Sequence, residues 1–175
     1  LSLPVEHQPG SWFAYDTAAT YMLSAIITKL TGESLLDYLR PRLFDPLGIE
    51  HPTWETDPRG ISLGGTGLHI TTEDIARFGQ LYLDGGREVL PADWVTYART
   101  ESTVPVDPGE QPYGAHWWLF PEVPGSFAAQ GYEGQRTLVV PDLDLVVVRL
   151  GKTPAELKPE LDRWLVALVD DLRRG

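Results

Sequence analysis

The sequence predicts an α+β fold in which helices flank an antiparallel sheet. Helical periodicity fills most of residues 18–99, whereas β-branched and aromatic runs gather in residues 113–150. The strongest β signal is a hairpin, in which two apolar runs surround the turn Pro141–Asp144. Both runs are apolar without alternation, which is typical of strands buried on both faces. We therefore expect this hairpin at the centre of a sheet covered by helices.

Two helices are expected near the start of the chain. Apolar side chains recur with a period near 3.6 over residues 18–30, and Gly32 is a natural stop. A second helix begins after Ser34, a good N-cap, and continues to about Phe44. Pro41 lies inside this helix, where it is expected to mark a kink or the start of a new turn.

The middle of the chain is expected to contain a long loop and two more helices. Residues 49–70 show no regular pattern. The clearest helix start follows at Thr71–Asp74, where a Thr N-cap precedes acidic residues that suit the helix dipole, and Gly85–Gly86 ends this helix. Pro91 is expected at the first position of a shorter helix, and residues 100–112 form a polar connector.

The last third of the chain is expected to form the sheet and a closing helix. Residues 114–120 predict one strand and the hairpin supplies two more, which makes three. Thr153 and Pro154 resemble a capping box with Pro at the first helical position. The chain thus divides into a mostly helical region, residues 1–112, and a sheet region, residues 113–175, within one structural domain. The apolar stripe of the closing helix should pack on the sheet: Leu157, Leu161, Trp164, Leu165, Leu168 and Leu172.

Composition narrows the functional classes. The chain has 175 residues and a formal net charge of −11, which argues against nucleic acid and anionic membranes as partners. It contains no Cys, so disulfides and thiolate metal sites are excluded. Its four His show no metal-ligand spacing, and no apolar run approaches the length of a membrane span. We therefore expect no metal and no cofactor, and nothing in the composition predicts a compartment.

Several segments together carry a family resemblance. They are Phe13–Thr17, Arg42–Ile49, Gly64–Leu68 and Thr72–Gly79. In their order and spacing they resemble the serine hydrolases related to class C β-lactamases and penicillin-binding proteins, and the resemblance covers essentially the whole chain. It implies a β-lactamase/transpeptidase-like fold, a mixed sheet with helices on both faces. It also implies hydrolysis of an amide, ester or peptide-like small molecule through an acyl-enzyme.

The nucleophile of the resembled family lies in a Ser-x-x-Lys pair, one helical turn apart. No Ser of this chain has Lys three residues later, and the chain opens on Leu1. The family's early strands and nucleophile helix are therefore expected upstream, and this chain is expected to be the C-terminal part of a longer hydrolase. By itself it should be nearly inactive. An incomplete sheet is also expected to depend on the N-terminal segment or to self-associate as a homo-oligomer.

Tyr15 aligns with the tyrosine of the family's Tyr-x-Asn motif. A free phenol has a pKa of about 10, and a nearby Lys could lower this value enough for proton transfer at neutral pH. Thr17 stands where the family has Asn; its hydroxyl can still donate and accept hydrogen bonds at a substrate. The alternative interpretation of Tyr15 is an amphipathic core tyrosine that precedes a helix.

The family's third motif, Lys-Thr-Gly or His-Thr-Gly, aligns with Ala129–Gly131. The cation is absent, which argues against efficient binding of a β-lactam carboxylate. The resemblance assigns Gln130 and Gly131 to substrate binding and makes the Tyr132 backbone N–H an oxyanion-hole donor. The alternative is that the glycines at 131 and 134 mark only a bulge or tight bend.

Two other functions remain open. Gly60–Gly64 matches the Gly-x-Ser-x-Gly elbow of another hydrolase class, with Ser62 as the nucleophile. That elbow needs a strand before it and a helix after it, whereas Pro58–Arg59 precede and more glycines follow. The chain could instead be a binding or interaction module without catalysis. An upstream Ser-x-x-Lys separates this module from the hydrolase.

Overall fold

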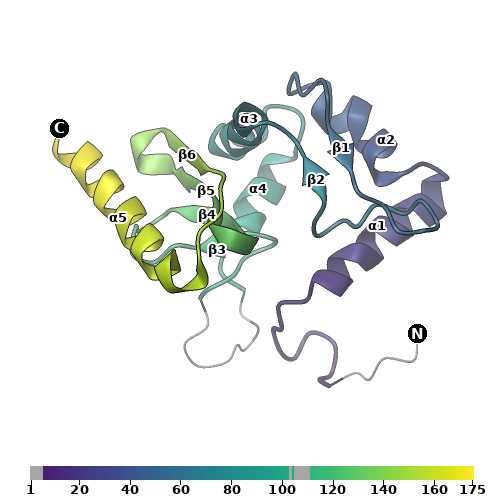
Figure 1. Ribbon diagram of the computed structural model, residues 1–175, viewed down its shortest axis with the longest axis horizontal. Helices are drawn as coiled ribbons and strands as arrows, with labels where there is room; N and C mark the ends of the chain where they lie inside the picture. The colour runs from purple at the N-terminus through teal and green to yellow at the C-terminus, as the bar shows by residue number, and fades with distance from the viewer. Residues whose placement is uncertain (1–5, 103, 105–110) are drawn as a thin grey trace.

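The computed structural model describes residues 6–102, 104 and 111–175 and shows the predicted α+β architecture. One antiparallel sheet has the strand order β3-β4-β5-β6, and helices cover both of its faces (Figure 1). Part of the predicted connector at residues 100–112 lies outside the described residues. The strands of this sheet are Trp118–Leu119 (β3), Phe127–Gly131 (β4), Gln135–Val140 (β5) and Leu145–Arg149 (β6).

The predicted hairpin is confirmed as β5 and β6. Val139 pairs with Val146, and a short 3-10 turn over Pro141–Leu143 joins the strands. Leu138 and Val139 are both fully buried although they point to opposite faces, so β5 is covered on both sides. In β6 every residue is only half-buried, because β6 is the last strand of the sheet.

The expectation of three strands is wrong, because β4 is a fourth strand between β3 and β5. Its residues Phe127–Gly131 include two alanines and a glycine, which have little β propensity, so pairing with β5 and not local preference makes them a strand. β3 is also shorter than predicted over residues 114–120, since regular pairing covers only Trp118–Leu119.

One face of the sheet packs against α3 (Thr72–Leu83) and α4 (Ala92–Ala98). The Thr71 N-cap is confirmed, and it forms a capping box with Asp74. Gly79 permits the close approach of α3, since a Cβ there would lie 2.6 Å from a methyl carbon of Val146. Pro91 precedes α4 as its N-cap residue and does not occupy the first helical position. The buried core on this face is Tyr82, Val95, Ala98, Trp117, Phe127 and Val139.

The opposite face packs against α5 (Lys158–Arg174). The predicted cap at Thr153 is wrong: a 3-10 turn, Ala155–Leu157, precedes α5, and no side chain caps the helix. The predicted stripe is wrong in part, because Leu165 and Val169 face the sheet while three apolar side chains stay exposed. Those three are Leu157, Trp164 and Leu172.

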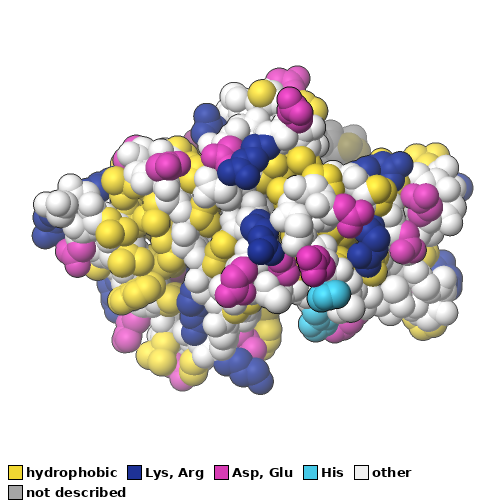
Figure 2. Space-filling model, turned by 90° about the horizontal axis from the view of Figure 1, so that it is seen from above, with side chains coloured by type: hydrophobic (Ala, Val, Ile, Leu, Met, Phe, Trp, Pro, Cys, Tyr) yellow, Lys and Arg dark blue, Asp and Glu magenta, His cyan; other side chains and the backbone are white. Residues whose placement is uncertain are grey.

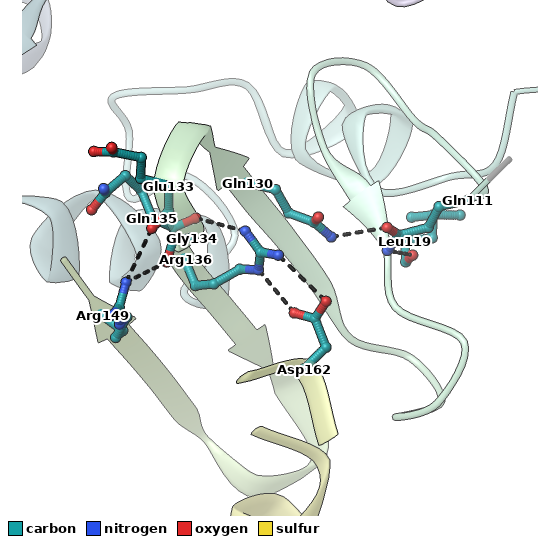
Figure 3. A network of polar contacts seen from close by, with 9 residues as sticks. All are labelled: Gln111, Leu119, Gln130, Glu133, Gly134, Gln135, Arg136, Arg149 and Asp162. Carbon is teal, nitrogen blue, oxygen red and sulfur yellow. Dashed lines mark hydrogen bonds and ion pairs between the residues drawn. The ribbon is translucent and has the colours of Figure 1, made fainter. Parts of the chain in front are cut away.

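An ion pair with a buried arginine accounts for the rotation of α5. The Arg136 side chain on β5 is 6% exposed, and its Nε donates to Asp162 Oδ1 at 3.1 Å (Figure 3). A buried guanidinium without a partner is costly, so the helix must turn Asp162 towards the sheet. Leu165 follows Asp162 onto that face, whereas Trp164 is carried to the outside.

The first helices are α1 (Thr17–Thr31) and α2 (Leu35–Leu39). Gly32 has the left-handed conformation at the end of α1, and the Ser34 side chain caps α2, as predicted. The break at Pro41 is a π-helical turn, Arg40–Phe44, that continues directly from α2. Asp16, not anticipated, caps α1 by accepting from the Ala18 N–H at 2.8 Å.

The expectation that residues 49–70 are irregular is wrong in part. Thr53–Trp54 (β1) and Leu68–His69 (β2) pair as a two-stranded antiparallel sheet. The loop between them packs closely on α1, since a Cβ at Gly64 would lie 2.8 Å from the carbonyl oxygen of Thr20. The division into regions 1–112 and 113–175 stays a prediction. No helix within the described ranges is long and apolar enough to cross a membrane.

Asp57 braces this loop against α1. One carboxylate oxygen accepts from the N–H groups of Arg59 and Ile61, both at 2.9 Å. The other accepts from the Tyr21 hydroxyl at 2.8 Å and from Arg59 Nε at 3.1 Å. These hydrogen bonds, chiefly those from the Ile61 N–H and the Tyr21 hydroxyl, lower the pKa of Asp57 to about 2.

Asp57→Asn should remove an acid-sensitive part of the stability. The pKa of Asp57 lies below its ordinary value of 3.8, so its ionised form stabilises the fold fully above that value. This contribution is lost as the pH falls through about 2. The wild-type free energy of unfolding should therefore fall between these two pH values more steeply than that of Asp57→Asn, measured by denaturant titration. Glu122→Gln, in an exposed turn, serves as the control, and equal slopes for Asp57→Asn and wild type would contradict the prediction.

Candidate active site

Tyr15 lies in the segment before α1 and is 58% exposed. It packs against Trp118 of β3, with ring centroids 5.3 Å apart, and against Tyr113 at 6.0 Å. Phe13 closes the group, with its ring 4.9 Å from Tyr113. These four rings, the aromatic cluster, join the segment before α1 to the edge of the sheet.

The third-motif residues lie at the end of the neighbouring strand. Trp118 pairs with Ala128 of β4, and Gln130 follows two positions later. Gln130 Nε2 donates to Gln111 Oε1 at 3.0 Å, and Gln111 lies two residues before Tyr113 of the aromatic cluster (Figure 3). The structure therefore brings Tyr15 and Gln130 into one neighbourhood, although they are far apart in the sequence.

Gly131 ends β4, and Tyr132 begins the turn into β5. The Tyr132 side chain is 83% exposed, so its own packing does not hold the turn. Glu133 and Gly134 both have positive φ, 57° and 81°. The tight bend inferred from the two glycines is thus present, and it presents backbone at the end of the sheet.

No contact within the described residues joins Thr17 to Gln130. It is the first residue of α1, and its methyl carbon faces the loop between β1 and β2. A Cβ on Gly65 would lie 2.9 Å from that methyl carbon. Ala129 also points away, because it packs into the core under α3 and α4. The position that holds the cation in the resembled motif is thus a small apolar residue in a core.

The aromatic partners of Tyr15 were not anticipated from the sequence. Trp117 and Trp118 are adjacent in the predicted strand at residues 114–120. Successive side chains of a strand point to opposite faces, so the two rings lie on opposite faces of the sheet. Trp117 is 2% exposed and lies in the core, which leaves Trp118 for Tyr15. Applied to this Trp pair, the same alternation could have identified Trp118 as the ring outside the core.

Burial raises the pKa of Tyr113 to about 12, and the neighbouring Tyr15 adds to the shift. Tyr113 therefore keeps its proton over the neutral range and can act only as a neutral phenol there. In the aromatic cluster, Tyr15 is the exposed phenol and Tyr113 the half-buried one. The two tyrosines are thus not equivalent as proton carriers.

Ser62 is not built as a nucleophile. It is fully buried, its hydroxyl has no hydrogen-bond partner within the described part of the chain, and it lies in an isolated bridge to Thr56. The glycine-rich loop follows it and leads to β2, not to a helix. The geometry therefore disfavours the Gly-x-Ser-x-Gly interpretation.

An open hollow of about 610 Å³ lies elsewhere, beside α3 and β2. Its lining includes His51, His69, Glu73 and Arg77, and charged side chains are spread over the face seen in Figure 2. Among the residues that the structure describes, no three His, Asp or Glu side chains are grouped as metal ligands. The hollow does not include Tyr15, Gln130 or any other expected site residue.

Known proteins share both this sequence and this fold. A family model described as Beta-lactamase matches residues 1–171. The chain belongs to the beta-lactamase family. A 6-aminohexanoate-dimer hydrolase from Paenarthrobacter ureafaciens is 28% identical in an alignment 165 positions long, which covers 87% of this chain and 41% of that protein. The chain therefore spans less than half the length of this relative.

Solved structures agree with the family assignment. A putative 6-aminohexanoate-dimer hydrolase from Bacillus anthracis superposes with a TM-score of 0.78 at 27% identity, covering 94% of this chain and 46% of that one. A beta-lactamase from Mycobacterium bovis, at 20% identity, shares the fold with a TM-score of 0.74, covering 92% of this chain and 66% of that one. The beta-lactamase/transpeptidase-like fold is confirmed, and the relatives are named as hydrolases of this family.

Ser62→Ala should leave any hydrolysis unchanged and should not lower stability, because it removes a buried hydroxyl that has no described partner. Ser126→Ala is the matched control: Ser126 is also buried, but its hydroxyl donates to the Val123 carbonyl at 2.7 Å. We expect the control to lose about 1–3 kcal/mol in thermal or denaturant unfolding. Loss of hydrolysis in Ser62→Ala would restore the elbow interpretation.

Proposed function

We propose that this chain is the C-terminal part of a serine hydrolase that forms an acyl-enzyme on an amide, ester or peptide-like substrate. The packing of Tyr15 on Trp118 carries this proposal, since it brings the tyrosine motif beside the strand that ends in Gln130 and Gly131. Family membership supports the reaction class, and the greater length of the relatives supports a nucleophile upstream.

The proposed reaction uses catalytic groups from both the upstream segment and this chain. An upstream Ser attacks the substrate carbonyl, and Tyr15, held ionised by the upstream Lys, takes up its proton. The Tyr132 N–H donates to the oxyanion that forms on the former carbonyl oxygen. Tyr15 then returns a proton to the leaving group, and water releases the acyl group by the same steps. Tyr113 remains protonated beside Tyr15 throughout, because its pKa is about 12.

The site suits a substrate without a carboxylate near the third motif. Ala129 replaces the cation of that motif and lies in the core, so it offers no partner to the carboxylate of a β-lactam. The aromatic cluster offers an apolar wall to the chain of a linear amide or ester. The names of the relatives, which include a hydrolase of a 6-aminohexanoate dimer, support a linear amide. Gln130 and Thr17 remain our candidates for polar contacts with the substrate.

We further propose that the upstream segment covers the apolar surface around α5 and β6. β6 ends the sheet, and beside it Trp164 and Leu172 on α5 and Leu157 in the preceding 3-10 turn are exposed. Figure 2 shows hydrophobic side chains gathered at the end of the molecule where α5 lies in Figure 1. A free strand edge next to an apolar helix stripe fits a strand and a helix of the same protein.

Tyr15→Phe tests the proton role. The chain joined to its upstream reading frame should react with a fluorophosphonate probe at the upstream serine, and peptide mass mapping locates the label. Without the phenol oxygen, hydrolysis of a linear amide or ester should fall by about 10²–10⁴-fold. Tyr97→Phe, on an exposed ring of α4, is the control and should react normally. No upstream Ser-x-x-Lys, or no label on it, would instead favour the binding-module hypothesis.

The upstream segment should also change the association state. We expect the chain alone to self-associate through the apolar surface in size-exclusion chromatography, and the longer protein to be smaller than that assembly or monomeric. Trp164→Arg should weaken self-association of the chain alone, because it places a charge in the apolar stripe. Tyr97→Arg, at another exposed ring, should not. A sharp monomer peak for the chain alone, with cooperative unfolding, would contradict the proposed partner.

A further inference from the structure

Side-chain contacts within the turn Tyr132–Gly134 contribute little to its conformation. It connects β4 to β5 at the point where Gly131 pairs with Gln135. Two of its residues, Glu133 and Gly134, have positive φ. The exposed ring of Tyr132 adds no hydrophobic anchor. Apart from the close packing of the buried Gly134 against Thr153 and Leu161, order in this turn comes from polar groups outside it.

Such groups are present at every carbonyl of the turn. Each of the three carbonyl oxygens accepts a hydrogen bond from a side chain or N–H that lies outside the turn. The donors come from the start of β5, the end of β6 and the loop that follows β6. Figure 3 shows Arg149 against the carbonyls of Glu133 and Gly134. The three bonds are Gln135 Nε2 to Tyr132 O at 3.1 Å, Thr153 N to Glu133 O at 2.9 Å and Arg149 Nη1 to Gly134 O at 3.0 Å.

The donors are themselves held together at Gly151. Gln135 binds both sides of this residue: its Nε2 donates to Gly151 O at 2.8 Å, and its Oε1 accepts from Gly151 N at 2.9 Å. Arg149 Nη1 donates to the same carbonyl at 3.0 Å. A Cβ on Gly151 would lie 3.2 Å from the guanidinium of Arg149, so a glycine lets the two groups approach. Gln135, Arg149 and Gly151 thus form one connected clamp.

We infer that Gln135 and Arg149 are positioning residues that hold the Tyr132 N–H in place for the oxyanion. The inference rests on the proposed function, which gives this N–H its role. Peptide groups are planar, so the Tyr132 N–H can move only with its neighbours. Hydrogen bonds hold the carbonyls of residues 132–134 on one side of it, and the pairing of Gly131 with Gln135 holds the chain on the other. Oxyanion donors stabilise the transition state best when they need not reorganise, which is what the clamp provides.

The clamp is distinct from the packing that supports the fold. Arg136, next to Gln135, is the buried arginine of the ion pair with Asp162, and it anchors α5. Gln135 and Arg149 are half-buried at the sheet end and direct their polar atoms to backbone groups of the turn. Removing one clamp donor should therefore loosen the turn and leave the two hydrophobic cores in place.

The test uses Gln135→Glu and Arg149→Met in the chain joined to its upstream reading frame. Gln135→Glu keeps the size of the side chain but replaces its donor with a carboxylate beside two carbonyl oxygens. We expect hydrogen exchange of the amides of residues 132–134 to rise at least about tenfold. We expect kcat for a linear amide or ester to fall about 10- to 100-fold, with KM within about twofold. Gln80→Glu, on a half-buried side chain of α3 that donates to Asp84, is the matched control and should change neither.

Each outcome decides one point. Unchanged exchange at residues 132–134 in both variants would overturn the clamp. Raised exchange with unchanged kcat would show a clamp that does not position a catalytic group, which also overturns the inference. A fall in kcat accompanied by global loss of protection would indicate a structural role alone. Absence of hydrolysis in the wild-type protein would overturn the proposed function instead, and the exchange measurement would still decide whether the clamp exists.

Discussion

The pairing of β4 with β5 is the constraint on which the rest of this structure depends. β5 is buried on both faces, and its register with β4 sets where the sheet ends and where the chain must turn. The same register fixes Trp118 through its pairing with β4 and thereby gives Tyr15 a surface to pack on. A shift of the register by one residue would move every side chain of β4 to the other face and would disrupt this packing.

The buried charge of Arg136 determines how α5 packs on the sheet. Arg136 lies within β5 and is compensated by Asp162, so α5 is turned to satisfy an ion pair and not to bury the most apolar surface. The consequence is visible at the surface, where Trp164 remains 54% exposed. The exposed apolar stripe next to the last strand of the sheet supports the proposed contact with further protein. The chain spans 41% of one relative and 46% of another.

The proposed site combines elements of different origin. The tyrosine motif lies before a helix, the oxyanion donor lies in a hairpin turn, and the two meet only through the aromatic cluster and the Gln111–Gln130 contact. No cation takes the place of the one in the resembled third motif at Ala129, which lies in the core. The chemistry of the wall is therefore apolar and neutral, which separates this site from one built to bind a carboxylate.

The sequence by itself determined the family, the α+β class, the caps at Ser34 and Thr71 and the β5–β6 hairpin, because these depend on local periodicity, capping and motif order. Sequence reasoning missed β4, whose residues have weak β propensity and become a strand only by pairing with β5. It also misjudged the face that α5 presents, since the Arg136–Asp162 pair joins residues distant in the chain. The neighbours of Tyr15 and the clamp at Gly151 were likewise decided only by tertiary structure, which alone brings such distant groups within hydrogen-bonding and packing distance.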